Sequence, residues 1–188
     1  LSYGFIEPDS IIDTAYNEQA LNPMASAPGL TLESLCDALG HIPLAYQPGT
    51  FWRYSLATDV TARLIEVISG QRFDEFLKAR IFEPLGMVDT DFFVPVDKQD
   101  RLTTLYLPTD PLDPMSECAT PMDSPAATTT AELPSFLSGG GGLMSTLVDY
   151  LAFVRMVVGD GCYQGKTLLK PETLALMRTN QCADGIGV

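Results

Sequence analysis

The segment of residues 105–138 restricts the fold of this chain more than any other part of the sequence. Proline recurs along it, and small polar residues fill positions 126–131. Proline lacks a backbone N–H and fixes φ, so this segment can form neither a long helix nor a central strand. We therefore expect a long proline-rich loop, and loops of this length are often functional or mobile. Its prolines are Pro108, Pro111, Pro114, Pro121, Pro125 and Pro134.

The residues outside this loop carry helical patterns. The strongest covers residues 56–68, with Ser55 at its head and Gly70 after it as suitable capping residues. Its apolar residues recur at helical spacing. Further helices are expected over 9–21, 32–41, 72–82, 146–158 and 171–177, the third of them ending at Pro84 and Gly86. Strand-like segments are few, the best being 91–96 and 101–106. The pattern predicts one mostly helical domain over residues 1–188, with little sheet.

Charge and hydropathy exclude several functional classes. The 188 residues include 11 Lys and Arg against 24 Asp and Glu, a formal net charge of −13. Such a chain repels a phosphate backbone, so we expect no nucleic-acid partner. No apolar run reaches the roughly 18 residues of a transmembrane helix, so no membrane span is expected. The segment between Arg101 and Arg155 has no basic residue. We interpret it as a solvated acidic surface, or as a dock for basic residues of another part of the protein.

The metal-binding residue types are scattered. Cys36, Cys118, Cys162 and Cys182 form no C-x-x-C pair, and the sole histidine, His41, has no ligand-spaced neighbours. We therefore expect no metal site and no cofactor, and we expect the cysteines to be buried free thiols.

Three stretches together point to a family. Residues 48–55 read Pro-Gly-Thr-Phe-Trp-Arg-Tyr-Ser, and the strongest helical pattern follows them directly. Residues 81–87 read Ile-Phe-Glu-Pro-Leu-Gly-Met, with Thr90 close behind. Residues 140–146 read Gly-Gly-Gly-Leu-Met-Ser-Thr, with Asp149 in the next helix. In this order, they resemble the serine β-lactamase-like superfamily of class C β-lactamases, penicillin-binding proteins and family VIII esterases.

This resemblance implies a protein of two lobes with the active site between them. A Ser-x-x-Lys pair supplies the nucleophile, a tyrosine motif comes from the helical lobe, and a Lys-Thr-Gly or His-x-Gly strand closes the site. The fold class implied for this chain is mainly α. It would be the helical lobe of the β-lactamase/transpeptidase-like fold, lacking most of the antiparallel sheet lobe.

The catalytic pair of the family is absent from these residues. None of Lys78, Lys98, Lys166 and Lys170 has a serine three residues before it. By the order of motifs in the family, the nucleophile is expected before Leu1 and the closing strand after Val188. The chain alone would then be inactive, and its partner would be the missing lobe of the same protein.

Tyr54 is the one catalytic candidate that the resemblance places in this chain. In the family, the matching tyrosine assists as general base. A free phenol has a pKa of about 10, so nearby cations must lower that value before it can act as a base at neutral pH. Ser55 and Leu56 complete the motif as substrate-binding candidates. Class C β-lactamases carry Asn at the third position, and leucine cannot hydrogen-bond, so esters are favoured over β-lactams. The alternative is that Tyr54 only caps the core beside Phe51 and Trp52.

The glycine run of residues 139–142 has two interpretations. It could hold phosphate before a helix, but it lacks the Lys-Ser/Thr ending of a P-loop. By resemblance, Gly140 and Gly141 lie beside the acyl pocket and bind substrate. Gly141 stands where class C β-lactamases place an aromatic residue, which implies room for bulkier acyl groups.

The sequence therefore predicts a fragment of a serine hydrolase that acts through an acyl-enzyme. Its small-molecule substrates would be carboxylic esters, or β-lactam or D-Ala-D-Ala-like amides, and it would need no metal or cofactor. The alternative is a non-catalytic penicillin-binding-like or protein-interaction module. A third interpretation is an anion-binding domain at the glycine run.

Overall fold

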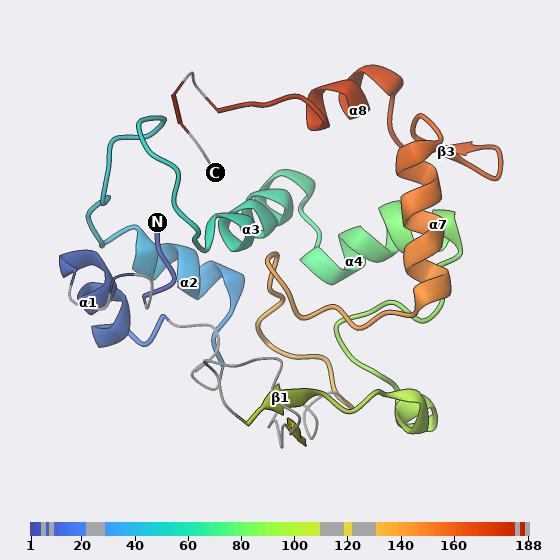
Figure 1. Ribbon diagram of the computed structural model, residues 1–188, viewed down its shortest axis with the longest axis horizontal. Coiled ribbons are helices and arrows are strands. Elements are labelled where there is room, and N and C mark those ends of the chain that lie inside the picture. Colours follow the sequence, from blue (N-terminus) through green and yellow to red (C-terminus); the bar gives the residue numbers. More distant parts are fainter. Residues whose placement is uncertain are drawn as a thin grey trace.

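The computed structural model describes residues 1–4, 7, 10–21, 29–109, 119–121, 131–182 and 185–186. Helices dominate these residues, with α1 and α2 on the left, α3 and α4 in the middle and α7 and α8 on the right of Figure 1. The α-helices are α1 (Ile11–Glu18), α2 (Leu32–Leu39), α3 (Ala57–Ser69), α4 (Phe73–Leu77), α5 (Glu83–Leu85), α7 (Leu147–Val158) and α8 (Pro171–Met177). A π-helix, η2 (Lys78–Phe82), joins α4 to α5, and a 3₁₀-helix, η3 (Val96–Arg101), follows.

Capping residues fix several helix ends where the sequence predicts them. Thr31 and Ser34 form a reciprocal capping box at the start of α2. Thr146 accepts a hydrogen bond from the Asp149 N–H at the start of α7. Gly70 ends α3 in the left-handed conformation, with φ of 67°. The predicted helices over 32–41, 56–68 and 146–158 are thereby confirmed to within a few residues.

The predicted helix over 72–82 is longer and less regular than expected. It changes from α to π at Lys78, returns to α at Glu83 and ends at Gly86, which has φ of 70°. Pro84 was predicted to end it and instead lies inside the last short turn. A proline is tolerated there because the first N–H groups of a helical turn need no partner within it.

The strand predictions are wrong. Within 91–96, Asp91 forms only an isolated bridge with Met144, and residues 96–101 form η3. The strands of the described residues instead form two short antiparallel pairs. Strand β1 (Tyr106–Pro108) pairs with β2 (Ala119–Pro121), and β3 (Cys162–Tyr163) pairs with β4 (Lys166–Thr167).

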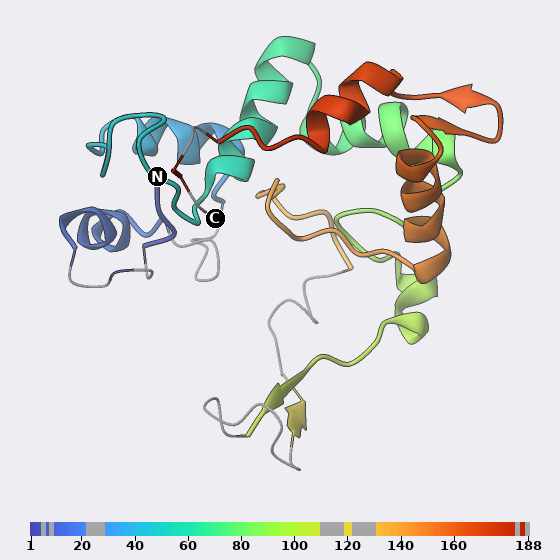
Figure 2. The same ribbon diagram turned by 45° about the horizontal axis from the view of Figure 1, so that its top comes forward.

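The first of these pairs lies inside the predicted loop. Strands β1 and β2 stand away from the helices (Figure 2). Each strand ends on a proline, which has no N–H to donate to the hydrogen bonds between strands. Residues 110–118 and 122–130 of the loop, with Cys118 and most of the acidic segment, lie outside the described residues. The three described cysteines are free, as expected, but none is buried: Cys36 and Cys182 are partly exposed and Cys162 is exposed.

The core consists of three apolar clusters that share partners. The first joins the N-terminal segment, α1 and α2 to the start of α3 through residues such as Tyr3, Leu35 and Leu56. The second packs α2, α3 and α4 against residues 133–137. The third packs η2 and α5 against α7. Phe136 contacts the first two clusters and Leu77 contacts the last two, so the three form one continuous core.

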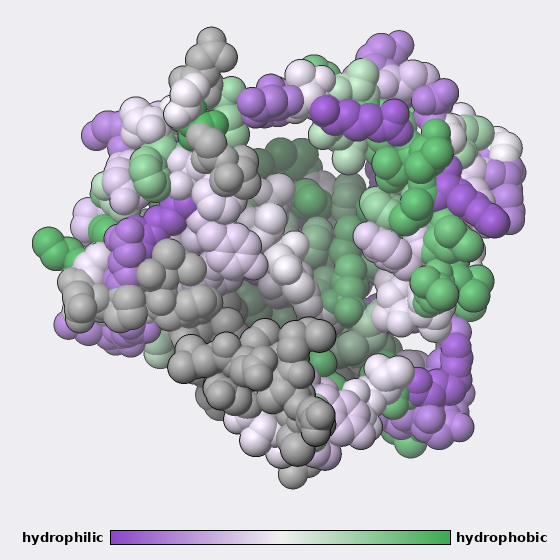
Figure 3. Space-filling view, viewed as in Figure 1, coloured by the Kyte–Doolittle hydropathy of each residue, from purple (hydrophilic) through white to green (hydrophobic). Residues whose placement is uncertain are grey.

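Large apolar side chains also remain outside this core. Along α7 they form a band of exposed residues, and Figure 3 shows apolar side chains gathered over this helix. None of the helices in the described part of the chain is long and apolar enough to cross a bilayer. The band comprises Leu147, Val148, Leu151, Val154 and Val158.

Candidate active site

Tyr54 lies in the segment that leads into α3 and exposes 58% of its surface. Its ring packs on that of Tyr3, with centroids 4.8 Å apart and planes tilted by 36°. Phe51 and Trp52 are exposed as well, and Phe51 stacks on Tyr46 rather than on Tyr54. Tyr54 therefore lies at the surface at the start of α3, and its ring packs on Tyr3.

Tyr3 is almost entirely enclosed, with 9% of its surface exposed. Burial raises the pKa of its phenol above the ordinary value, and hydrogen bonding to Tyr54 and the charges of Tyr54 and Asp59 raise it further. A hydrogen bond with Thr58 acts in the opposite direction. Because burial dominates and raises its pKa, Tyr3 keeps its proton at neutral pH.

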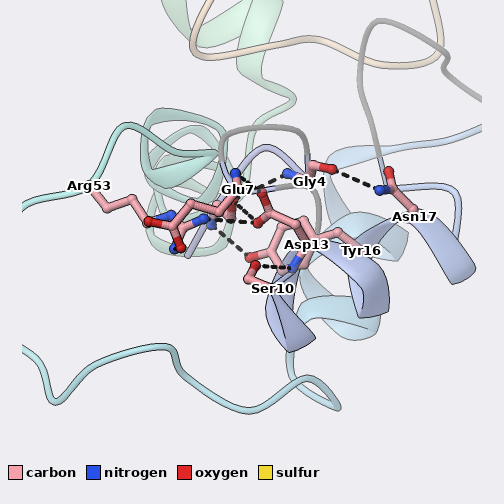
Figure 4. A network of polar contacts seen from close by, with 8 residues as sticks. Gly4, Glu7, Ser10, Asp13, Tyr16, Asn17 and Arg53 are labelled. Atoms are coloured by element: carbon pink, nitrogen blue, oxygen red, sulfur yellow. Dashed lines mark hydrogen bonds and ion pairs between the residues drawn. The ribbon is translucent and has the colours of Figure 1, made fainter.

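A buried ion pair fixes the backbone on both sides of this tyrosine pair. Figure 4 shows Arg53 reaching from its loop toward Asp13 on α1, where Nη2 lies 3.0 Å from Oδ1. The side chain of Arg53 is 8% exposed and that of Asp13 is fully buried. The hydroxyl of Ser2 donates to the same Asp13 oxygen, and the Glu7 N–H donates to Oδ2 at 2.6 Å. The guanidinium of Arg53 thus bonds both Asp13 and, through Nη1 at 3.1 Å, Glu7.

The glycine run packs against the first turn of α3. Asp59, which is 1% exposed, accepts a hydrogen bond from Ser138 Oγ at 2.6 Å and a longer one from the Gly140 N–H at 3.4 Å. A Cβ on Gly139 would lie 2.2 Å from the Thr58 carbonyl oxygen, so no side chain fits there. A Cβ on Gly140 would lie 3.2 Å from Tyr3 Oη, which places this glycine beside the tyrosine pair.

Most of the predicted site residues meet at this end of α3. Tyr54 and Ser55 precede the helix, and Gly140 lies beside its first turn. The Ser55 hydroxyl accepts a hydrogen bond from the Ala57 N–H at 3.3 Å, while Leu56, not Ser55, is the helix N-cap. Gly141 follows, with no described atom within 4 Å of a Cβ built on it.

Unlike the other predicted site residues, Leu56 is buried. Its side chain is fully buried in the first core cluster. It therefore presents no surface to a ligand in these residues, and the substrate-binding role that the motif implied for it does not agree with its position.

Sequence reasoning missed Tyr3, Asp13 and Asp59. Each acts through a partner far away in the chain: Asp13 with Arg53 is separated by 40 residues, and Asp59 with Gly140 by 81. Asp59 does occupy the first turn of a helix, where acidic residues are favoured, but that signal says nothing of its burial or of the glycine run.

The phosphate interpretation of the glycine run conflicts with this geometry. The Gly140 N–H already donates to the buried carboxylate of Asp59. A carboxylate beside the run repels phosphate and occupies a donor that phosphate would need. No group of three or more potential metal ligands is found among the residues that the structure describes.

A cavity of about 490 Å³ lies elsewhere, between α5, η3 and the segment before α7. Phe82, Met87 and Met144 supply apolar walls, and Asp89 supplies an acid. Hydrogen bonds from Arg101, which has the larger effect, and from Lys98 lower the pKa of Asp89 to about 2. The cavity contains neither Tyr54 nor a glycine of the run, so its chemistry is distinct from that at the start of α3.

Comparisons with known proteins agree with the arrangement of these elements. A family model described as Beta-lactamase matches residues 3–187. Protein Rv1367c of Mycobacterium tuberculosis is 37% identical over 184 residues, which is 98% of this chain and 42% of that protein. Lovastatin esterase of Penicillium rubens is 31% identical over 171 residues, 90% of this chain and 39% of its own length. The chain thus spans less than half the length of these relatives.

Solved structures show the same similarity. EstCE1, described as a hydrolase with promiscuous acyltransferase activity, superposes with a TM-score of 0.72 at 25% identity, over 87% of this chain and 44% of its own. Simvastatin synthase (LovD) from Aspergillus terreus superposes with a TM-score of 0.73 over 99% of this chain and 42% of its own. Its identity is 21%, so this second match bears on the fold alone.

Proposed function

We propose that the whole protein is a serine hydrolase acting on small carboxylic esters, because this chain belongs to the beta-lactamase family. The mainly helical fold of the chain agrees with that family. In this proposal, residues 1–188 form a single domain, the helical lobe, and they contribute Tyr54 as the residue that moves the proton. The nucleophilic serine, its lysine and the closing strand lie outside these residues, so the chain alone is inactive.

The observation that carries this proposal is the exposed position of Tyr54 at the start of α3. It is exposed, yet its backbone is fixed by the Arg53–Asp13 pair and its ring rests on Tyr3. A proton-transfer group needs both access to the reacting atoms and a fixed position. Gly140 lies alongside, and Gly141 follows it with open space where its side chain would be, which leaves room for an acyl group.

A phenol needs a nearby cation to act as a base, and the adjacent Arg53 is already bonded to Asp13 and Glu7. Arg53 is turned toward Asp13, and only about one phenol in a thousand is ionised at pH 7 without help. In the proposal, the lysines of the two outlying motifs supply this charge. The isolated chain would therefore show no ester hydrolysis, although its fold and Tyr54 are intact.

Two observations favour esters over β-lactams. Leu56 replaces the asparagine of class C β-lactamases and is fully buried, so it offers no amide to a β-lactam side chain. Among the similar proteins, lovastatin esterase and the Burkholderia gladioli esterase EstB carry esterase names.

The test compares substrates and variants in the full-length protein. We expect short p-nitrophenyl esters to be cleaved faster than a chromogenic cephalosporin. Tyr54→Phe should lower kcat by about a hundredfold or more, the usual contribution of a general acid–base group. Tyr46→Phe is the matched control, since Tyr46 is also exposed and also packs on an aromatic ring.

Each arm can fail separately. Faster cleavage of the cephalosporin would remove the ester preference. Full activity of Tyr54→Phe would remove the role of the phenol. A full-length protein that neither turns over esters nor reacts with a fluorophosphonate probe would favour the non-catalytic penicillin-binding-like module.

A further inference from the structure

We infer that Tyr3 is a positioning residue for Tyr54: the two phenols form a hydrogen-bonded pair in which Tyr3 donates to the Tyr54 oxygen. This inference rests on the proposed role of Tyr54 and extends it to a residue more than 50 positions away in the sequence. The pair, rather than Tyr54 alone, would be the proton-transfer unit of this lobe.

Asp13 holds the two tyrosines against each other. Ser2, which precedes Tyr3, and Arg53, which precedes Tyr54, both bond the same oxygen of Asp13. The Leu56 N–H also donates to the Ser2 carbonyl at 3.3 Å, which ties the two segments together a second time. With their backbones fixed in this way, the rings of Tyr3 and Tyr54 meet at 4.8 Å.

The hydroxyl of Tyr3 is enclosed on its other sides. Thr58 hydrogen-bonds to it from the first turn of α3. A Cβ on Gly140 would lie 3.2 Å from Tyr3 Oη, so only a residue without a side chain fits beside this hydroxyl without a shift. Tyr3 exposes 9% of its surface and Tyr54 58%, so Tyr54 reaches a ligand and Tyr3 acts through it.

The charges around the pair determine the direction of the hydrogen bond. Tyr54 and Asp59 face Tyr3 from the start of α3, and Asp13, neutralised by Arg53, lies on the side of α1. Burial and these neighbours raise the pKa of Tyr3, and in the proposed pair Tyr3 keeps its proton and donates it to the Tyr54 oxygen. A hydrogen bond to a phenolate is stronger than one to a phenol. Tyr3 therefore stabilises the form of Tyr54 that accepts the proton of the nucleophile.

The first test needs no catalytic activity. In the chain labelled with ¹³Cζ-tyrosine, NMR titration reports the pKa of Tyr3 directly. Tyr54→Phe should lower the pKa of Tyr3, because the hydrogen bond and charge of Tyr54 are lost, but not to the ordinary value, because burial remains. The control Tyr46→Phe should leave it unchanged. An unchanged pKa of Tyr3 in Tyr54→Phe would overturn the pairing.

The second test uses the full-length protein. Tyr3→Phe keeps the ring and removes only the hydroxyl. We expect kcat to fall about ten- to a hundredfold, the effect of losing a hydrogen bond to a charged group, with KM nearly unchanged. The acid limb of the pH profile of kcat should move to higher pH. Tyr163→Phe, which also removes the hydroxyl of a half-buried tyrosine but in the third core cluster, should leave both unchanged.

The two tests separate the inference from the proposed function. If Tyr3→Phe keeps the wild-type kcat and pH profile while Tyr54→Phe is inactive, the inference is wrong and the role of Tyr54 stands. If Tyr54→Phe is fully active, the proposed function is wrong, whatever the NMR titration shows. If Tyr3→Phe fails to fold, the pairing is tested by the pKa of Tyr3 in the Tyr54→Phe variant alone.

Discussion

Asp13 is the most deeply buried charged residue in the described part of the chain. Its carboxylate is fully buried and is compensated by Arg53, the hydroxyl of Ser2 and the Glu7 N–H. A buried charge without such partners costs several kcal/mol. Its function at the site is therefore inseparable from its role in stability.

Asp13→Asn tests this role. The substitution leaves Arg53 buried beside a neutral amide, and we predict a loss of about 3 kcal/mol in the free energy of unfolding, measured with urea. Glu7→Gln is the control, because Glu7 bonds the same arginine but is 57% exposed, so its loss should cost less than about 1 kcal/mol. Equal losses in the two variants would contradict the account.

Gly139 and Gly141 differ in the space that a side chain would have, so they can be compared by substitution with alanine. A Cβ on Gly139 would lie 2.2 Å from the Thr58 carbonyl oxygen, whereas none of the described atoms lies within 4 Å of one on Gly141. Gly139→Ala should lower the free energy of unfolding by about 1–3 kcal/mol, the usual cost of overpacking. Gly141→Ala should be near neutral. A destabilised Gly141→Ala beside an unaffected Gly139→Ala would show that the glycine run packs differently.

Sequence reasoning could find Tyr54 because a contiguous motif surrounds it and a strong helical pattern follows. It could not find Tyr3 or Asp59, since their roles come from contacts that the fold alone creates. For the same reason, burial of Leu56 could not be foreseen from its place in the motif.

At the scale of elements, helices were predictable and strands were not. Helix ends depend on residues a few positions apart, as in the Thr31–Ser34 capping box, and a single sequence contains that signal. The strands of the described residues are two or three residues long, too short for an alternating pattern. Their pairing depends on partners along the chain rather than on their own composition.

The 3₁₀-helix η3 is held to the turn after α5 by charge. Asp89 lies 2.5 Å from Lys98 and 2.9 Å from Arg101, and these hydrogen bonds lower its pKa to about 2. A carboxyl whose pKa is lower in the folded state stabilises the fold above its unfolded pKa, and this contribution is lost as the pH falls toward 2.

Asp89→Asn tests this attachment. The variant should be less stable than the wild type at pH 6, and the difference in Tm should shrink between about pH 4 and pH 2. The measurement is thermal unfolding followed by circular dichroism across this range. A difference in Tm that is the same at pH 6 and pH 2 would show that the ion pairs do not act through the charge of Asp89.

At the scale of the whole molecule, one apolar face remains uncovered. It is the band along α7, where Leu147 is 84% exposed and Val148 76%. Contiguous apolar surface of this kind is typical of an interface. In the proposed function, another part of the full-length protein covers it, in agreement with a chain that spans less than half of its relatives.

The chain by itself should therefore self-associate. The net charge of −13 opposes contact between copies at low salt, so association should grow as salt screens it. Sedimentation velocity at several concentrations in 0.5 M NaCl is the measurement, and Leu147→Lys with Val148→Glu should reduce the associated fraction. A chain that stays monomeric under all these conditions would indicate that the α7 face is not an interface.

The central claim is that Tyr54 serves the proton transfer by which an ester acylates the serine of the full-length protein. Mass spectrometry of that protein, quenched at short times after mixing with a p-nitrophenyl ester, measures acylation itself. We predict that the wild type gains the mass of one acyl group and that Tyr54→Phe gains it about a hundredfold or more slowly, while Tyr46→Phe matches the wild type. Equal acylation rates for Tyr54→Phe and the wild type would contradict the account.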